Sequence, residues 1–112
     1  MGRKGSESAC VPQLLGALGE NQMRTIWKYT LVLGGSAKFR MPKGAKVLCA
    51  QEQFQQFCIW AVVDTSQPGE EREFILLGTG NPIMVPDANL KYVDTMQTQD
   101  GHFVGHLFEV LP

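Results

Sequence analysis

The chain has 112 residues, of which 44% are hydrophobic and 19% are charged. This length and composition fit one globular domain and exclude a disordered chain. No apolar run approaches the roughly 20 residues that a membrane-spanning helix needs, so we expect no membrane segment.

The net charge of −1 is unevenly distributed along the chain. Residues 1–46 carry eight basic and two acidic side chains, whereas residues 47–112 carry two basic and nine acidic ones. Such asymmetry can mark a partner surface. We favour the simpler interpretation that strands from the two halves interleave, so that their charges mix on the surface.

Residues 1–22 differ from the rest of the chain, because they are rich in Gly and Ser and show no alternating pattern. We interpret them as a flexible leader or N-terminal extension that precedes a single small β domain over residues 23–112. The apolar stretch 11–19 weakly resembles a signal peptide, but Gln13 and Gly16 interrupt it and Glu7 weakens the basic region before it. We therefore expect a cytoplasmic protein.

The first half of the patterned region predicts four strands. Apolar and polar side chains alternate over residues 25–33 and 37–41, with Gly34-Gly35 and then Pro42-Lys43-Gly44 as turns. Two further strands are predicted over residues 45–53 and 57–64, joined by a Gln-rich bend. The second of these is apolar on both faces, which is typical of a central strand covered on both sides.

The second half predicts three more strands. Pro68-Gly69 has the order that a type II turn prefers, and the strand that follows it, residues 73–78, is the expected partner of residues 57–64. Residues 81–89 contain two prolines and predict a connection. The last two strands, residues 91–98 and 102–110, flank a hairpin turn at Gln99-Asp100-Gly101.

In total we expect about seven short strands at roughly ten-residue spacing, an arrangement typical of all-β domains. The predicted fold is all-β, or a β-dominated α+β fold. Its strands would form an antiparallel meander that closes into a small barrel or a two-layer roll.

No motif indicates a catalytic or metal site. Residues 78–82 (Gly-Thr-Gly-Asn-Pro) lack the later glycine of a dinucleotide fingerprint and favour a strand-terminating turn. His102 and His106 would lie about 13 Å apart on a strand, too far to share one ion. We expect no enzyme activity, no cofactor and no metal.

The three cysteines, Cys10, Cys49 and Cys58, form no CxxC pair. The predicted bend brings Cys49 and Cys58 almost opposite each other. In a reducing cytosol we expect free thiols that pack as small hydrophobic side chains.

Nucleic-acid binding is not expected. Single-strand binders combine a basic groove with exposed aromatic side chains, but alternation places the aromatic and basic side chains of this chain on opposite faces. The basic set is Lys28, Lys38, Arg40, Lys43 and Lys46, and the aromatic set is Trp27, Tyr29 and Phe39.

Four segments in order carry a family resemblance: IWKY (26–29), PKGA (42–45), WAVVD (60–64) and GTGNPI (78–83). Together they resemble a family of small proteins encoded by phages and prophages, which is known only as a domain of unknown function. The resemblance covers about residues 23–110. It implies a phage origin and a compact β fold, and it brings no catalytic residues. Together with the cytoplasmic location expected above, a phage origin leads us to expect the protein in the host cytoplasm.

The leading functional hypothesis is a non-enzymatic phage accessory protein that binds a host or phage protein. In its concrete form it antagonises an anti-phage defence complex, as an anti-CRISPR protein does, by protein–protein contact. An aromatic side chain at a hairpin tip is costly to leave in water, which directs attention to the Gln-rich bend. The expected partner-binding residues are Phe54, Gln55, Gln56, Glu70, Glu71 and Glu73.

The alternative is a small-molecule binder, such as a sponge for a nucleotide signal, built as a homo-oligomer. Strands that are apolar on both faces in so short a chain suggest a homodimer through the last strand or through residues 57–64. Trp27 or Trp60 would stack on the ligand. The polar ligand-binding residues would be Lys43, Lys46, Thr79, Asn81 and His106.

Overall fold

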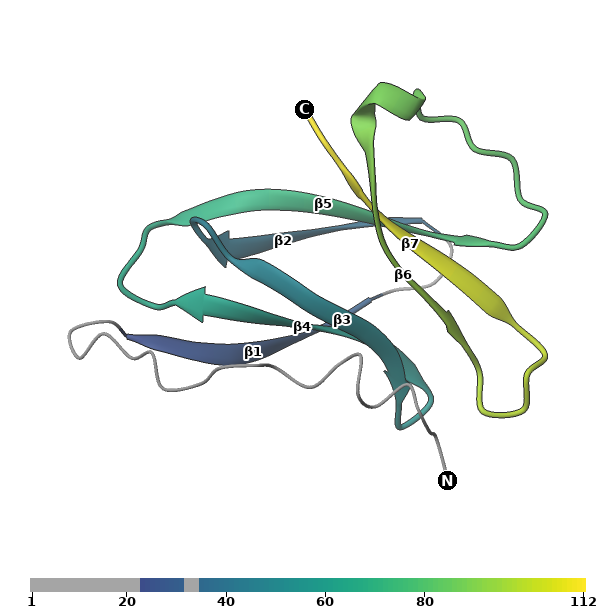
Figure 1. Ribbon diagram of the computed structural model, residues 1–112, viewed down its shortest axis with the longest axis horizontal. Coiled ribbons are helices and arrows are strands. Elements are labelled where there is room, and N and C mark those ends of the chain that lie inside the picture. The colour runs from purple at the N-terminus through teal and green to yellow at the C-terminus, as the bar shows by residue number, and fades with distance from the viewer. Residues whose placement is uncertain (1–22, 32–34) are drawn as a thin grey trace.

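The computed structural model describes residues 23–31 and 35–112, which form an all-β fold (Figure 1). The predicted leader, residues 1–22, lies outside the described residues. Seven strands are present in the described part, as predicted, together with one turn of 3-10 helix. In chain order they are β1 (Arg24–Thr30), β2 (Ser36–Pro42), β3 (Lys46–Gln53), β4 (Gln56–Asp64), β5 (Gly69–Gly78), η1 (Asp87–Asn89), β6 (Leu90–Gln97) and β7 (Val104–Val110).

The strands form two antiparallel sheets that pack on each other as in a β-sandwich (Figure 1). One sheet has the order β1-β4-β3 and the other β2-β5-β7-β6. Of the two predicted closures, the two-layer arrangement is therefore confirmed and the closed barrel is wrong. The predicted meander is also wrong. Among the described strands, only β3 and β4, and β6 and β7, are both consecutive in the chain and hydrogen-bonded to each other.

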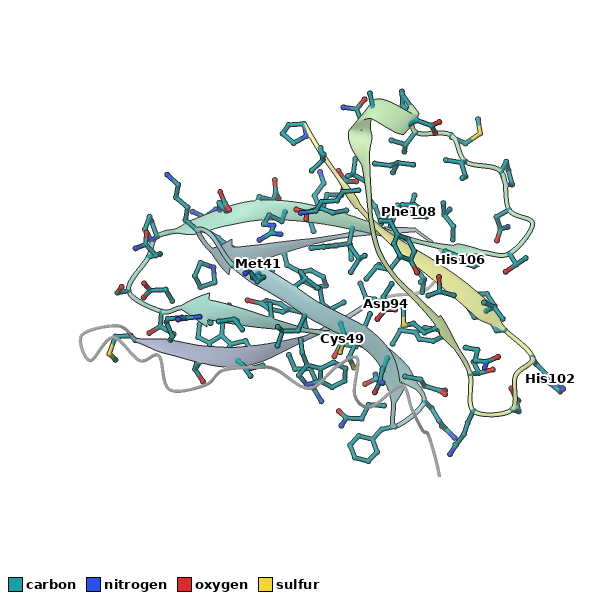
Figure 2. All side chains as sticks on the ribbon, viewed as in Figure 1. Met41, Cys49, Asp94, His102, His106 and Phe108 are labelled. Carbon is teal, nitrogen blue, oxygen red and sulfur yellow. The ribbon has the colours of Figure 1, made fainter. Side chains whose placement is uncertain are left out.

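The core lies between the sheets and follows from the alternating pattern. β4 contributes Ile59 and β5 contributes Phe74, and both side chains are completely buried. Met41, at the end of β2, is completely buried between the sheets as well (Figure 2). Burying a side chain of this size contributes about 1.5–3 kcal/mol, so this shared face is the main source of stability.

Strand β4 is the central strand of its sheet, as its two apolar faces predicted. Ile59 and Val63 face the core, while Cys58 and Val62, on the opposite face, are buried as well. The expected partner of β4 is wrong, however. β5 lies in the other sheet and pairs with β2 and β7, because the chain crosses between the sheets after Asp64.

Two of the predicted turns are confirmed by their backbone geometry. The Ala45 amide donates to the Pro42 carbonyl at 3.0 Å across a turn in which Gly44 has φ 84°. The Thr98–Phe103 turn likewise contains Gly101 at φ 76°. Glycine adopts this left-handed backbone without the steric cost that other residues meet.

The predicted type II turn at Pro68-Gly69 is wrong. Gly69 is the first residue of β5 and does not have the positive φ that such a turn requires. The chain reverses earlier, where the Gln67 amide donates to the Asp64 carbonyl at 3.0 Å. The Asp64 carboxylate accepts hydrogen bonds from the Ser66 hydroxyl at 2.6 Å and the Ser66 amide at 3.0 Å. These two bonds lower the pKa of the Asp64 carboxyl and stabilise the turn.

On one side of the sandwich the edge strands β3 and β6 are linked through side chains. The Ala50 amide donates to Asp94 Oδ2 at 2.9 Å, and the Gln99 amide donates to Glu52 Oε1 at 2.8 Å. Asp94 lies between β6 and β3 (Figure 2) and follows a register shift in the β6–β7 pair. Carboxylate side chains therefore connect the two sheets along the β3–β6 seam, where β3 and β6 form no backbone hydrogen bonds of a shared sheet.

The charges of the two halves of the chain mix as we predicted. β2 pairs with β5, which places Lys38 opposite Glu73 and Arg40 opposite Glu71 on the outer face. The aromatic side chain that alternates with these basic ones, Phe39, points into the core. The aromatic and basic sets of β2 are thus separated on two faces.

The cysteine prediction is correct for one residue and wrong for another. Cys58 is a buried free thiol. Cys49 is buried too, but it is disulfide-bonded, and Cys58 is not its partner. In the register of β3 and β4, Cys49 lies opposite Trp60, and Cys58 lies opposite Gln51.

Candidate functional site

The β3–β4 hairpin ends in a two-residue turn that presents an aromatic side chain to solvent. Gln53 pairs with Gln56, and Phe54 and Gln55 form the tip. Phe54 is 85% exposed, although the apolar side chains of the strand that it follows are buried or half-buried. Beside the turn, Lys28 of β1 donates through Nζ to Gln53 Oε1 at 2.8 Å, which holds the tip against the neighbouring strand.

The backbone of this tip is unusual. Phe54 has φ 53° and Gln55 has φ 65°, and these are the non-glycine residues with positive φ in the described part of the chain. A hairpin turn with two left-handed residues is normally Asn-Gly. Other L-residues in this region cost about 1–2 kcal/mol each, so the sequence of the tip is not the one that stability favours.

A second hairpin tip lies beside the first at the same end of the molecule (Figure 1). In the β6–β7 turn, Asp100 Oδ1 accepts hydrogen bonds from the Thr98 hydroxyl at 2.6 Å and the His102 amide at 2.9 Å. The Thr98 bond and then the His102 bond lower the pKa of Asp100. Beneath the two tips, the rings of Phe57 and Phe103 pack with centroids 5.7 Å apart.

The predicted partner-binding residues fall into two separate groups. Phe54, Gln55 and Gln56 lie together at the β3–β4 tip. Glu70, Glu71 and Glu73 lie in the first half of β5, which begins beyond the far end of β4. The three glutamates are therefore not part of the same surface as the tip.

The polar residues predicted for a ligand are also divided. Thr79 and His106 meet, because the Thr79 hydroxyl and His106 Nε2 are 2.7 Å apart. Asn81 lies two residues further along, in the turn in which its amide donates to the Gly78 carbonyl at 3.0 Å. Lys43 follows β2 at the opposite end of β5, where its amide bonds to Pro68. Lys46 begins β3 in the other sheet.

A hydrogen-bonded chain runs from Thr79 across the outer face of the four-stranded sheet. His106 Nδ1 is 3.1 Å from the Thr95 hydroxyl, which is 2.8 Å from the Tyr92 hydroxyl. The Tyr92 ring also packs edge-on against Phe108, with centroids 5.7 Å apart. Sequence reasoning had included Thr79 and His106 but missed Thr95 and Tyr92, because the bulge in β6 sets which side chains meet β7.

The two histidines do not share a strand. His106 lies in β7, whereas His102 lies in the turn before it and projects from the end of the hairpin (Figure 2). His102 Nδ1 is 3.5 Å from Asp100 Oδ2, and both side chains are largely exposed. Among the described residues, no group of three or more His, Cys, Asp or Glu side chains is placed to hold a metal ion.

A buried ion pair on the inner face of the four-stranded sheet was not predicted from the sequence. Arg72 of β5 donates through Nε and Nη2 to the two carboxylate oxygens of Glu109 in β7, at 2.7 and 2.9 Å. Its Nη1 donates to the Ala45 carbonyl at 2.5 Å, and its guanidinium lies 5.9 Å from the Phe74 ring centroid. The Glu109 bonds raise the pKa of Arg72. The sequence did contain an indication of this pair, because Arg72 and Glu109 both occupy inward-facing positions of the alternating strand pattern.

Two further exposed hydrophobic features were not predicted. In the connection between β5 and η1, Met84 is 84% exposed and Ile83 is 51% exposed. Tyr92 of β6 is 57% exposed. The remaining large exposed hydrophobic side chains are Met23, Trp27 and Leu111. None of these side chains combines exposure with a left-handed backbone, so the β3–β4 tip is the most distinctive surface feature of the described chain.

The fold and this tip define a small β-sandwich protein that presents a projecting aromatic side chain. A family model described as a domain of unknown function (DUF7352) matches residues 23–112, and the chain belongs to this family. The expected membership in a family of unknown function is thereby confirmed. No curated protein and no solved structure matches the chain. Within the described residues, no helix is long and apolar enough to cross a membrane.

Proposed function

We propose that this protein is a non-enzymatic binding protein that acts by protein–protein contact through the β3–β4 tip. The observation that supports the proposal is Phe54, an 85% exposed aromatic side chain on a left-handed two-residue turn. Aromatic side chains dominate binding energy when they enter a partner pocket. A turn that forgoes the stable Asn-Gly sequence and exposes a phenyl ring suggests selection for contact with a partner.

The test replaces the tip by the sequence that the turn geometry prefers. The double variant Phe54→Asn/Gln55→Gly should raise the free energy of unfolding by about 1 kcal/mol, since it relieves the left-handed strain. It should also lose the partner that the wild-type chain binds. Met84→Ala is the matched control, because Met84 is 84% exposed at another site. Retention of the partner by the stabilised tip variant would overturn the proposal.

The finer proposal is that the chain is a phage or prophage protein that antagonises a host defence complex in the host cytoplasm. The sequence resemblance supports the origin, and the projecting aromatic tip supports a role by contact. The assay is plaque formation on a bacterial strain with an active CRISPR system, with and without expression of the chain. Expression should restore plaques and Phe54→Ala should not. Equal plaque numbers with and without wild-type chain, across strains with different defence systems, would refute the role.

The second candidate function is small-molecule binding, and the meeting of Thr79 with His106 beside Thr95 and Tyr92 favours it. Hydroxyl, imidazole and phenol groups on one open face offer donors, acceptors and a ring to a nucleotide. Thermal unfolding in the presence of a panel of cyclic nucleotides tests this function. A raised midpoint that disappears in His106→Ala supports it, and an unchanged midpoint across the panel contradicts it.

A further inference from the structure

The two hairpin tips at one end of the sandwich form a single preorganised unit. The Gln99 amide of the β6–β7 turn donates to Glu52 Oε1 of β3 at 2.8 Å. Below this bond, Phe57 at the start of β4 packs against Phe103, the residue just before β7. A polar bond at the surface and an aromatic contact beneath it thus connect the two hairpins.

The β6–β7 turn is also fixed internally. Besides the two bonds to Asp100, the Thr98 amide donates to the Phe103 carbonyl at 2.9 Å, and the Phe103 amide donates to the Thr98 hydroxyl at 3.2 Å. A surface that is ordered before binding loses less conformational entropy when a partner docks. The second tip is therefore as suited to recognition as the first.

The charge of this end of the molecule indicates the character of its partner. Residues 51–56 and 97–103 contain the acidic residues Glu52 and Asp100 and no Lys or Arg. The Asp100 side chain is 65% exposed, and its carboxyl is ionised at neutral pH, as an ordinary Asp side chain is. The exposed neighbours of Phe54 in the chain, Gln55 and Gln56, are uncharged amides. The Lys28 ammonium also reaches the β3–β4 tip, where it bonds to Gln53, so the exposed negative charge of this end lies at the β6–β7 tip, on Asp100.

We propose that both hairpin tips form one binding surface for a protein with an apolar pocket and a basic rim. Phe54 enters the pocket, the glutamine side chains bond to its border, and Asp100 faces the basic rim. This inference rests on the proposed function and adds to it a second contact region and the charge of the partner. Complementary charge at a rim mainly accelerates association and selects among partners.

The experiment places a photo-crosslinking amino acid, p-benzoylphenylalanine, at position 54, 99 or 84 of the full chain, expressed in the cells in which the gene occurs. All three positions are exposed, so the fold is expected to tolerate the probe, and circular dichroism checks this. The probes at Phe54 and Gln99 should label the same protein, and the probe at Met84 should not. Labelling from position 54 alone would overturn the shared surface but leave the proposed function intact.

No labelled protein from position 54 would overturn the proposed function itself. If all three probes labelled the same protein, the proposal that the partner contacts only the two tips would be overturned. The charge of the partner is tested with Asp100→Lys in the position-54 probe chain, which should lower the cross-link yield about fivefold at low salt. Asp87→Lys, an exposed acidic position at η1, is the matched control. An equal yield from both lysine variants would overturn the basic rim.

Discussion

Removing one member of the Arg72–Glu109 pair should destabilise the protein far more than removing both. Glu109 is buried in β7 and accepts two hydrogen bonds from the guanidinium of Arg72. In Glu109→Leu, the guanidinium keeps its positive charge between the sheets but loses both acceptors. In the double variant Arg72→Met/Glu109→Leu, the same space is filled by apolar side chains of similar size and no charge remains.

The magnitude follows from the burial of the pair. Breaking a buried ion pair by removing one partner costs about 3–5 kcal/mol. The Arg72 and Glu109 side chains retain 15% and 10% of their exposure, so we expect the lower end, about 3 kcal/mol. The double variant should cost only about 1–2 kcal/mol, mainly because the Ala45 carbonyl loses its Nη1 donor. In a domain of this size, 3 kcal/mol lowers the melting temperature by about 12–24 °C.

The assay is urea unfolding followed by circular dichroism, with the wild type, both single variants and the double variant measured under one condition. The four free energies form a double-mutant cycle. The expected result is strong non-additivity, with the double variant more stable than either single one. Additive losses, which would leave the double variant about 6 kcal/mol below the wild type, would refute the view that the uncompensated charge is the dominant cost.

Three further outcomes are expected. Gly105→Ala should cost about 1–3 kcal/mol in urea unfolding by overpacking, because its Cβ would lie 2.9 Å from Leu76 Cδ1; an unchanged midpoint would contradict this. Asp94→Ala should cost about 1–3 kcal/mol by leaving the buried Ala50 amide unpaired, and Asp94→Asn, which keeps an acceptor, should cost less; equal losses would argue against the seam. The pKa of Asp100 is lowered below 3.8 on folding, so its stabilisation is present above that pH and is lost as the pH falls through the folded pKa. The melting temperature of the wild type should therefore fall more steeply than that of Asp100→Asn as the pH is lowered below about 4, and parallel curves would contradict it.

The strands themselves could be predicted because their pattern is local. Alternation over residues 37–41 and an apolar run over 57–64 reflect burial on one or both faces, and both segments are strands with the predicted faces inward. The pairing of strands could not be predicted in the same way. β4 and β5 are similar apolar segments separated by a short link, which suggests a hairpin, but the cross-over after Asp64 sends them into different sheets.

The candidate site was predictable only in part, because it too depends on which strands pack together as well as on local pattern. The exposure of Phe54 follows from its place at a hairpin tip, which the Gln-rich bend between two strands made visible. That Thr98 to Phe103 lies beside it depends on the packing of β3 against β6, two strands distant in sequence. The Arg72–Glu109 pair was missed because a charged residue at an inward position looks like a defect in the pattern until its partner in the neighbouring strand is known.

Although β7 follows β5 and β6 in the chain, it occupies an inner place between them. During translation the four-stranded sheet therefore has a gap until β7 has been synthesised, and the edges of β5 and β6 stay unpaired and open to aggregation until then. A nascent chain that stalls before Val104 would lack an inner strand of the sheet rather than an edge strand. Products of premature termination should consequently be substrates for proteases and not shortened, partly active forms.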